Sequence, residues 1–249
     1  MRRPRSAFRV VGAGAVGLAL LAPAAAGAQA VRVEGVAAIV GGTAPGSGAT
    51  VVYRSDAVLR ARIALAGRSE RLPVGPVPEA LLAAALDELI GEVLIEREAD
   101  RLRAARPSDE EVARERRRIE AQAGGAARLS ELLRAVGASD EEVDRAARRR
   151  AYVNAFLRAN LEGSTVVSDA QLARVYESER HPFAGRPLEE VREPLRAWIA
   201  RRALARDVRR WIEVLRRRTT VLVLVPWQRA SDGTADGAWE GQGDGEDGG

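Results

Sequence analysis

Three related helix-start phrases divide the middle of this chain. The sequence SDEEV occurs at Ser108–Val112 and again at Ser139–Val143, and SDAQL occupies Ser168–Leu172. A serine at a helix N-cap accepts a hydrogen bond from a first-turn N–H, and a Glu or Gln three residues later bonds back to the serine N–H. Acids in the first turn also favour the positive end of the helix dipole. The phrases therefore predict three helices with defined starting points.

Apolar residues at helical spacing, with glycines and prolines between them, predict the remaining helices. The clearest is 79–105, where Leu82, Leu86, Leu89, Ile90, Val93 and Leu94 recur on one side before Pro107 ends it. The three serine-initiated helices are expected to stop near Gly124-Gly125, Leu161 and Arg180. The others are 55–66, capped by Ser55 or Asp56 and ending at Gly67; 126–136, ending at Gly137; and a last helix that starts with Pro187 and kinks at Pro194.

Two strands are expected near the start of the chain and one near its end. Val31–Val40 and Ala49–Arg54 flank a glycine-rich turn, Gly41–Gly48, and the β-branched run Thr219–Pro226 follows the last helix. Unpaired apolar strand edges are a liability, so the early and late strands are expected to pair with each other. The predicted fold is mainly α, with a small β-sheet that joins the N-terminal and C-terminal strands.

The first 30 residues have the pattern of a secretory signal peptide. Four arginines precede an acid-free apolar run, Val10–Ala22, and the small residues that follow end in Ala28-Gln29-Ala30, an A-x-A cleavage site, so the exported chain should begin at Val31. An uncleaved membrane anchor is the alternative, and a twin-arginine signal is a weaker one because Arg2-Arg3 lack the usual flanking residues. Cleavage would leave a periplasmic protein with no stable membrane insertion.

Removing the leader changes the interpretation of charge. The chain has 39 basic and 35 acidic residues, and the leader holds four arginines and no acid, so the exported chain is formally neutral. The high calculated pI therefore gives no support for nucleic-acid binding. The six acids of the Gly-rich tail 231–249 lie among no bases, which leaves 31–230 mildly basic. We expect the tail to be disordered and the arginine/glutamate pattern to form solvated helix faces, with weak attraction to anionic surfaces as the alternative.

The residue inventory excludes most catalytic chemistry. The chain has no cysteine and no lysine, which rules out disulfides, a Schiff-base lysine and a Walker A lysine, and it has one histidine. His181 lies in the loop His181–Arg186, where a structural role is favoured over a catalytic or metal-binding one. The acids Asp109-Glu110-Glu111 are explained by a helix first turn. We therefore assign no catalytic, cofactor-binding or metal-binding residue.

The four tryptophans fall into two groups. Trp198 and Trp211 lie on the apolar stripe of the last helix, which favours core positions over a ligand platform. Trp227 and Trp239 lie outside the predicted helices and are expected to be exposed. The spacing of the SD phrases also permits a helical repeat array, but the residues after each phrase share no apolar register, so the array is a minor alternative.

The predicted elements, taken in order, resemble a known family. The segments that carry the resemblance are GVAAIVGG, RSDAVLRARIAL, ALLAAALDELIGEVLIEREADRL, PSDEEVARERRRI, LSELLRAVGASDEEVDRAARRRAYVNAFLR, VVSDAQLARVYESER and PLEEVREPLRAWIARRALARDVRRWIEVLRRRTTVLVLVP. Together they are similar to the N-terminal chaperone domain of SurA-type periplasmic proteins, from Val31 to about Pro226. Together with the leader and the tail identified above, the resemblance divides the chain into a signal peptide (1–30), a helical chaperone domain (31–230) and the acidic tail (231–249).

The chain departs from that family in one respect. SurA-type proteins commonly carry parvulin prolyl-isomerase domains before the closing helix, where this chain has only the short loop His181–Arg186. The resemblance implies the chaperone half alone, which binds extended apolar segments of unfolded envelope proteins, above all outer-membrane proteins, without ATP, cofactor or isomerase chemistry. No motif marks its peptide-binding residues. The alternatives are a prolyl-isomerase-related enzyme and a non-catalytic structural partner in the cell envelope.

Overall fold

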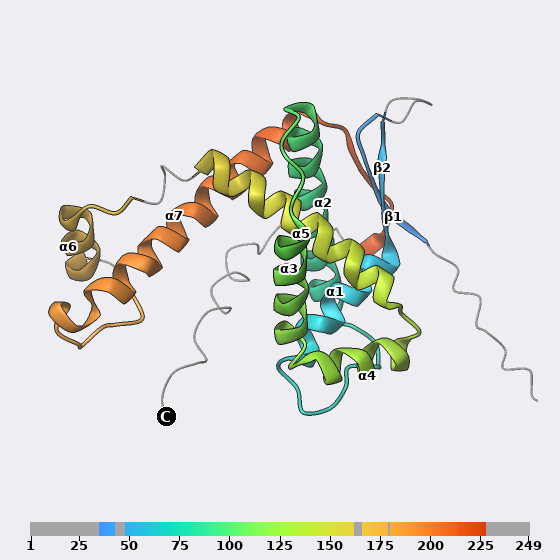
Figure 1. Cartoon of the computed structure of the whole chain (residues 1–249), viewed down its shortest axis with the longest axis horizontal. Helices are drawn as coiled ribbons and strands as arrows, with labels where there is room; N and C mark the ends of the chain where they lie inside the picture. The colour runs from blue at the N-terminus through green and yellow to red at the C-terminus, as the bar shows by residue number, and fades with distance from the viewer. Residues whose placement is uncertain (1–34, 43–47, 162–165, 179, 228–249) are drawn as a thin grey trace, which may run out of the picture. The chain divides into compact units, whose positions relative to one another are not determined.

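The computed structural model of the chain describes residues 35–42, 48–161, 166–178 and 180–227, all within the unit Glu34–Gly249. These residues are mainly helical with one small antiparallel sheet, which confirms the predicted fold class (Figure 1). The predicted signal peptide, the tail 231–249 and Trp239 lie outside the described residues. The elements are β1 (Val36–Val40), β2 (Thr50–Tyr53), α1 (Arg54–Ala66), α2 (Glu79–Arg101), α3 (Asp109–Gln122), α4 (Ala126–Val136), α5 (Asp140–Leu161), α6 (Asp169–Ser178), α7 (Leu188–Arg218) and β3 (Val221–Val223).

The three serine phrases start helices α3, α5 and α6 as predicted. At Ser108 the capping box is complete, because the Glu111 N–H donates to the serine hydroxyl at 3.2 Å and the serine N–H donates to the Glu111 carboxylate at 3.0 Å. At the second phrase, the N–H of Ser139 donates to the carboxylate of Glu142 at 2.7 Å. At the third, the N–H of Gln171 donates to the serine hydroxyl at 3.2 Å. These bonds satisfy backbone groups that a helix start leaves without partners.

Helix α2 ends earlier than its apolar periodicity predicts. It stops at Arg101, and the backbone then turns through Arg103, whose φ of 54° is left-handed. The N–H of Ala104 donates to the carbonyl of Ala99 at 2.9 Å, which is the six-to-one hydrogen bond of a Schellman motif. An arginine here takes a conformation that usually favours glycine, so no local sequence pattern marks this helix end. The expected end at Ala105 was therefore wrong.

Helix α1 starts directly from strand β2. It begins at Arg54 with Tyr53 as its N-cap residue, and the Tyr53 side chain makes no cap hydrogen bond, so the predicted N-cap at Ser55 or Asp56 was wrong. The N–H of Arg54 instead donates to the carbonyl of Gly35 at 2.8 Å, which ties the helix start to the residue before β1. The sheet therefore replaces the side-chain cap.

Gly67 ends α1 for a different reason from the one predicted. Its φ of −71° is helical rather than left-handed. A Cβ atom on Gly67 would lie 2.1 Å from the carbonyl oxygen of Gln122, at the end of α3. Glycine is required here because two backbones approach closely, not because of a left-handed turn.

Helix α7 is the longest element and runs through Pro194, where we expected a kink. Pro187 is its N-cap rather than its first helical residue, a shift of one position from the prediction. Helix α6 ends at Ser178, two residues before the predicted Arg180, and only residues 179–187 separate it from α7. No independent domain fits in a segment of that length.

The sheet joins the two ends of the described chain. Its strand order is β2-β1-β3, and both pairs are antiparallel. Ile39 in the middle strand pairs with Val51 on one side and with Leu222 on the other. The predicted pairing of N-terminal and C-terminal strands is confirmed.

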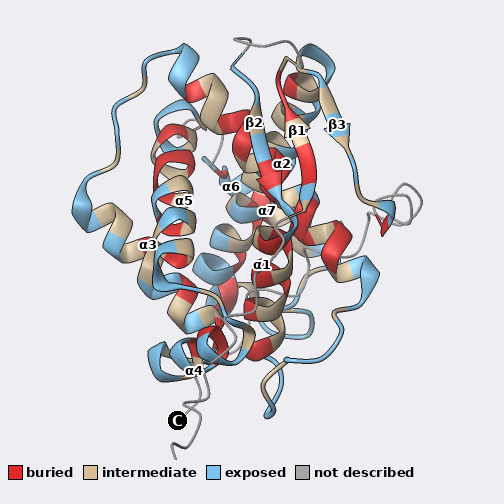
Figure 2. Ribbon diagram, turned by 90° about the vertical axis from the view of Figure 1, so that its right-hand side faces the viewer, coloured by how far each residue is buried: buried red, intermediate tan, exposed pale blue. Residues whose placement is uncertain are grey.

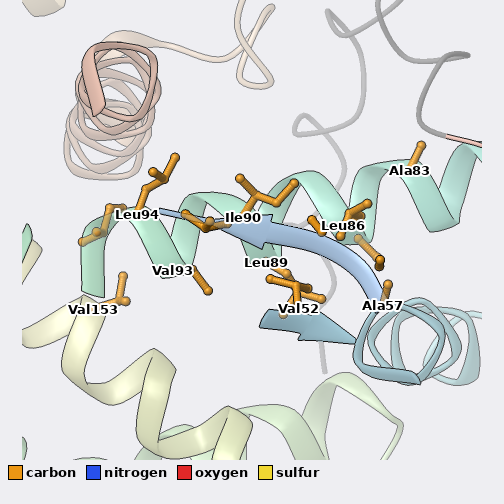
Figure 3. Close-up of a cluster of buried hydrophobic side chains, with 14 of the residues drawn as sticks. Val52, Ala57, Ala83, Leu86, Leu89, Ile90, Val93, Leu94 and Val153 are labelled. Atoms are coloured by element: carbon orange, nitrogen blue, oxygen red, sulfur yellow. The ribbon is translucent and has the colours of Figure 1, made fainter. Parts of the chain in front are cut away.

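Helix α2 is the centre of the main core. Its apolar residues pack against the sheet, α1, α5 and α7, and Leu86 and Ile90 are fully buried (Figure 3). The six residues that defined its apolar periodicity are all buried, as predicted. The inner face of the sheet adds Ala38, Val40 and Val52 to the same cluster.

Two smaller clusters complete the packing. One lies among α1, α3, α4 and α5, and the other joins α6 to the first half of α7. Figure 1 shows α6 beside that half of α7, away from the main helices. The α6–α7 pair is further held by Asp169, which accepts hydrogen bonds from Arg196 at 2.8 Å and from Arg192 at 3.3 Å. Helix α7 therefore contributes to two separate cores.

Candidate functional site

The outer face of the three-stranded sheet carries the main group of exposed apolar side chains. The described helices pack on the other face, and Figure 2 shows the strands in front of them. Val51, Ile39 and Leu222 form one row across the three strands because they are register partners. The outer apolar face consists of Val36, Ile39, Val51, Tyr53, Leu222 and Leu224. All except the half-buried Ile39 expose between 36% and 51% of their surface.

A β-bulge in β1 keeps Val36 on this face. The register shifts between Val36 and Ala38, so the extra residue, Ala37, joins Ala38 in the core, and both are fully buried. Val36 then pairs with Tyr53, which lies two residues beyond Val51 and so on the same side of β2. Without the bulge, strict alternation would place Val36 inward.

Strand β3 is an edge of the described sheet. The N–H of Gly41 donates to the carbonyl of Thr220 at 2.8 Å, and the N–H of Leu224 donates to the carbonyl of Ala37 at 2.9 Å. In an antiparallel ladder hydrogen-bonded pairs alternate with non-bonded ones, so the backbone groups of Val221 and Val223 point away from β1. This edge presents N–H and C=O groups at which an extended peptide can pair.

The three strands lack the usual devices that protect a sheet edge. They contain no charged residue and no proline, and the only side chains with a polar group are those of Thr50 and Tyr53. Natural edge strands are commonly blunted by charges, prolines or bulges, and here the bulge lies in the central strand. The short length of β3, three residues, is the one limit on pairing.

Sequence reasoning missed this surface, although one signal was available. From Val221 to Trp227 the odd-numbered residues point inward and pack in or against the main core, whereas Leu222 and Leu224 are exposed. The period of two in VLVLVPW therefore distinguished the two faces. Trp227 is buried at 4% exposure as the last inward residue, so its expected exposure was wrong.

His181 is held by backbone groups in its loop. The N–H of Phe183 donates to Nδ1 at 3.2 Å, so the proton lies on Nε2, which is 3.2 Å from the carbonyl oxygen of Tyr176. The imidazole also stacks with the rings of Tyr176 and Phe183, at centroid distances of 5.4 Å and 6.4 Å. These contacts fit the structural role expected for this residue.

The other residues considered from the sequence, Glu111, Trp198 and Trp211, have structural contacts and do not belong to the outer apolar face. Glu111 completes the cap of α3, and the hydrogen bond from the Ser108 N–H lowers the pKa of its carboxyl. Trp211 packs against Phe156 in the main core at a centroid distance of 5.3 Å. Trp198 is half-buried beside α6, with the guanidinium of Arg202 4.6 Å from its ring centroid. Neither indole forms part of an open platform with the sheet.

A second polar feature lies inside the helical body. The Arg60 guanidinium, 8% exposed, donates to both carboxylate oxygens of Glu92 at 2.7 Å and 2.8 Å, and to Glu88 at 3.2 Å. Burial opposes the charge on Arg60, but attraction to the two glutamates outweighs it and raises the pKa of the guanidinium. Nearby, burial raises the pKa of Glu96 even though Arg149 lies 3.3 Å from its carboxylate.

A pocket of about 50 Å³ opens beside these charges, between α1, α2, α3 and α5. That volume holds a few water molecules and is far below the roughly 300 Å³ at which small-molecule sites begin. Its charged lining includes Asp56, whose pKa is raised by burial, together with Arg145 and Arg149. We interpret the network as structural.

The described residues limit what other sites are present. No group of three or more His, Cys, Asp or Glu side chains among them is placed to hold a metal ion. None of the helices in the described ranges is long and apolar enough to cross a bilayer.

Comparison with known proteins adds no family assignment. Neither a scan of protein-family models nor a search of curated proteins finds a match to this chain. The resemblance to SurA-type chaperone domains therefore stays a prediction from the sequence.

Proposed function

We propose that this chain is an ATP-independent chaperone of the bacterial periplasm that binds extended apolar segments of unfolded envelope proteins. The observation that carries the proposal is the outer apolar face of the sheet, bounded by the open edge of β3. Contiguous exposed apolar surface on a folded protein marks an interaction site. The signal-like leader, and the order of elements that resembles a SurA-type chaperone domain, point to the same compartment and role.

The geometry of the β3 edge favours a client, meaning a bound unfolded protein, whose backbone is in β conformation. A client in β conformation can pair its backbone with Val221 and Val223 while one side of it packs beside Leu222 and Leu224. Strands of outer-membrane barrels alternate apolar and polar side chains, so an unfolded barrel protein offers many such segments. Main-chain pairing accepts many sequences, which suits a chaperone that must bind different clients.

The direct test is suppression of aggregation. A denatured outer-membrane barrel protein is diluted into buffer with equimolar chain, and light scattering is followed without nucleotide. Scattering should be suppressed by the natural chain and less so by Leu222→Thr/Leu224→Thr, which keeps strand propensity but removes exposed apolar area. The matched control is Val74→Thr/Leu102→Thr, because these residues are similarly exposed, at 53% and 49%, outside the sheet.

A second pair of variants separates backbone pairing from side-chain packing. Val221→Pro removes an N–H that points away from β1, and proline is tolerated at the first residue of an edge strand. Val221→Ala loses the same side chain but keeps the N–H, so it measures the effect of lost side-chain packing alone. Val221→Pro should suppress aggregation less well than Val221→Ala, because it also lacks the backbone donor. If Leu222→Thr/Leu224→Thr and Val221→Pro both suppress aggregation as well as the natural chain, the outer apolar face is not the binding site. Failure of the natural chain itself to suppress aggregation would reject the chaperone role, and acceleration of proline isomerisation in a peptide would favour an enzyme.

A further inference from the structure

One side of α7 changes character half-way along the helix. Spacings of three and four residues put eight positions on a single stripe. These are Val191, Leu195, Ile199, Arg202, Arg206, Arg209, Glu213 and Arg217. The first three are buried, Leu195 and Ile199 in the cluster formed with α6, and the last five are exposed. Helix α6 therefore covers the apolar half of the stripe and leaves the arginine half open.

The second half of α7 buries a different side. Val208, Trp211 and Leu215 pack in or against the main core, on the side of the helix away from the stripe. The arginines consequently face solvent along the length over which α7 is attached to the body. We call Arg202, Arg206, Arg209, Arg210 and Arg217 the arginine stripe; Arg210 lies one turn beyond Arg206.

Four of the five arginines in this stripe, Arg206, Arg209, Arg210 and Arg217, are poorly compensated by the described residues. Residues 201–218 hold eight arginines and two acids, which leaves a net charge of +6. Elsewhere arginines are paired, as Arg196 is with Asp169, but no ion pair joins Arg206, Arg209, Arg210 or Arg217 to any described residue. Arginines three and four residues apart on a helix repel one another, so folding alone does not account for the stripe.

The complementary charge is in the same chain. The tail 231–249 carries six acids and no base, a net charge of −6. Four of the acids recur every fourth residue, each followed by glycine: Asp232-Gly233, Asp236-Gly237, Glu240-Gly241 and Asp244-Gly245. Trp239 lies in the middle of this repeat, and an indole is the best ring for stacking on a guanidinium.

The tail is long enough to reach the stripe. It follows Trp227, which is fixed in the core beyond β3, and β3 itself follows α7 after two residues. From Thr219 to Trp227 the chain covers at most about 30 Å, and an extended segment of 19 residues spans about 60 Å. A tethered segment also has a high effective concentration at a nearby site.

We propose that the acidic tail, residues 231–249, docks on the arginine stripe of α7 in the same molecule. The carboxylates of the D/E-G repeat pair with the arginines, and Trp239 stacks on a guanidinium of the stripe. The contact neutralises the open half of the helix, and it is released by salt or by a polyanion that competes for the same arginines. This docking does not depend on the chaperone function.

The test measures the distance between tail and stripe in the chain from Val31 onward. The protein has no cysteine, so two introduced cysteines can be spin-labelled without background. One label at Gly245→Cys is combined with Ala205→Cys beside the stripe, or with Ser130→Cys on α4 as a control, and distances are measured by pulsed electron paramagnetic resonance. At low salt the first pair should show a narrow short-distance population that disperses in 1 M NaCl, where the screening length is about 3 Å. The control pair should be broad in both conditions.

Charge reversal completes the test. Arg206→Glu/Arg210→Glu should abolish the short-distance population, whereas Arg134→Glu/Arg148→Glu, which reverses as many exposed arginines elsewhere, should leave it intact. A distribution that is broad at low salt, or that is equally sensitive to both double substitutions, would overturn the proposal. Dilution with unlabelled chain distinguishes docking within one molecule from docking between two. A short-distance population that disappears on dilution would place the tail on a second copy of the chain.

Discussion

The buried contact between Arg60 and Glu92 provides a quantitative test of what holds α1 against α2. The two side chains are 8% and 16% exposed, and one guanidinium nitrogen reaches both carboxylate oxygens within 2.8 Å. Glu88, the second partner of Arg60, is 36% exposed and can be rehydrated if Arg60 is removed. Arg150 lies 3.5 Å from Glu92 and would partly replace the missing charge.

These contacts set the expected free energies. Breaking a buried ion pair from one side costs about 3–5 kcal/mol, because a charge is left without its partner. For Arg60→Met we expect the lower end, about 3 kcal/mol, since Arg150 and solvent compensate in part. Glu92→Gln should cost about 1.5 kcal/mol, because Arg60 keeps Glu88 and can still donate to the amide oxygen. The double variant should cost only about 2 kcal/mol, since neither charge of the Arg60–Glu92 pair is left buried without the other.

Urea unfolding at pH 7, followed by helical circular dichroism, gives the four free energies of this double-mutant cycle. The values above correspond to a coupling energy of about 2.5 kcal/mol between Arg60 and Glu92. A coupling energy below about 0.5 kcal/mol would show that the two side chains act independently, and the structural interpretation of the network would then be wrong. A changed slope against urea would instead signal that a variant alters the unfolded state or the cooperativity of unfolding.

Two further predictions concern backbone approach and pH. Gly67→Ala should destabilise the protein by about 2 kcal/mol although the φ of Gly67 is helical, because the new Cβ would lie 2.1 Å from the Gln122 carbonyl oxygen. The control is Gly75→Ala, where a Cβ has open space, and it should be neutral or stabilising by up to about 1 kcal/mol. Equal urea unfolding midpoints for the two variants would refute the close approach at Gly67. The hydrogen bond and charge of Arg196 lower the pKa of Asp169, so this contact stabilises the α6–α7 pair above the ordinary carboxyl pKa of about 4 and is lost as the pH falls through the lowered value. Hydrogen exchange of α6 amides should therefore speed up in acid relative to α2, and Asp169→Asn should show fast α6 exchange already at pH 7; an unchanged α6 in that variant would contradict the role of the contact.

The helices could be predicted from the sequence because their signals are local. A serine followed three residues later by Glu or Gln fixed the starts of α3, α5 and α6, and the glycines after α3 and α4 fixed their ends. The errors occurred where long-range contacts decide the backbone. The start of α1 depends on a bond to Gly35, and the glycine at its end is required by the carbonyl of Gln122 in α3, more than 50 residues away in the sequence. No local pattern contains these contacts.

The outer apolar face was harder to predict for a related reason. The strands were recognised by their apolar and β-branched residues, but their two faces differ only after β1 has paired with both β2 and β3. The bulge that turns Val36 outward and Ala37 inward is a property of that pairing. The arginine stripe is similar, since α6 divides one continuous helix side into a covered half and an open half.

The sheet ties the proposed function to the fold through the two sides of the same strands. Val52 and its inward neighbours close the core over α2, while Val51 and Tyr53 on the alternate positions remain open. Changes at inward positions should therefore unfold the protein, and changes at outward positions should alter binding and leave stability nearly constant. The middle strand β1 is paired on both sides, so only β3 or β2 can accept a client, and of the two β2 is bound to α1 without a break. Of the two edges, that of β3 combines the backbone groups of Val221 and Val223 that point away from β1 with the exposed side chains of Leu222 and Leu224, so it is the edge at which we propose that a client strand adds.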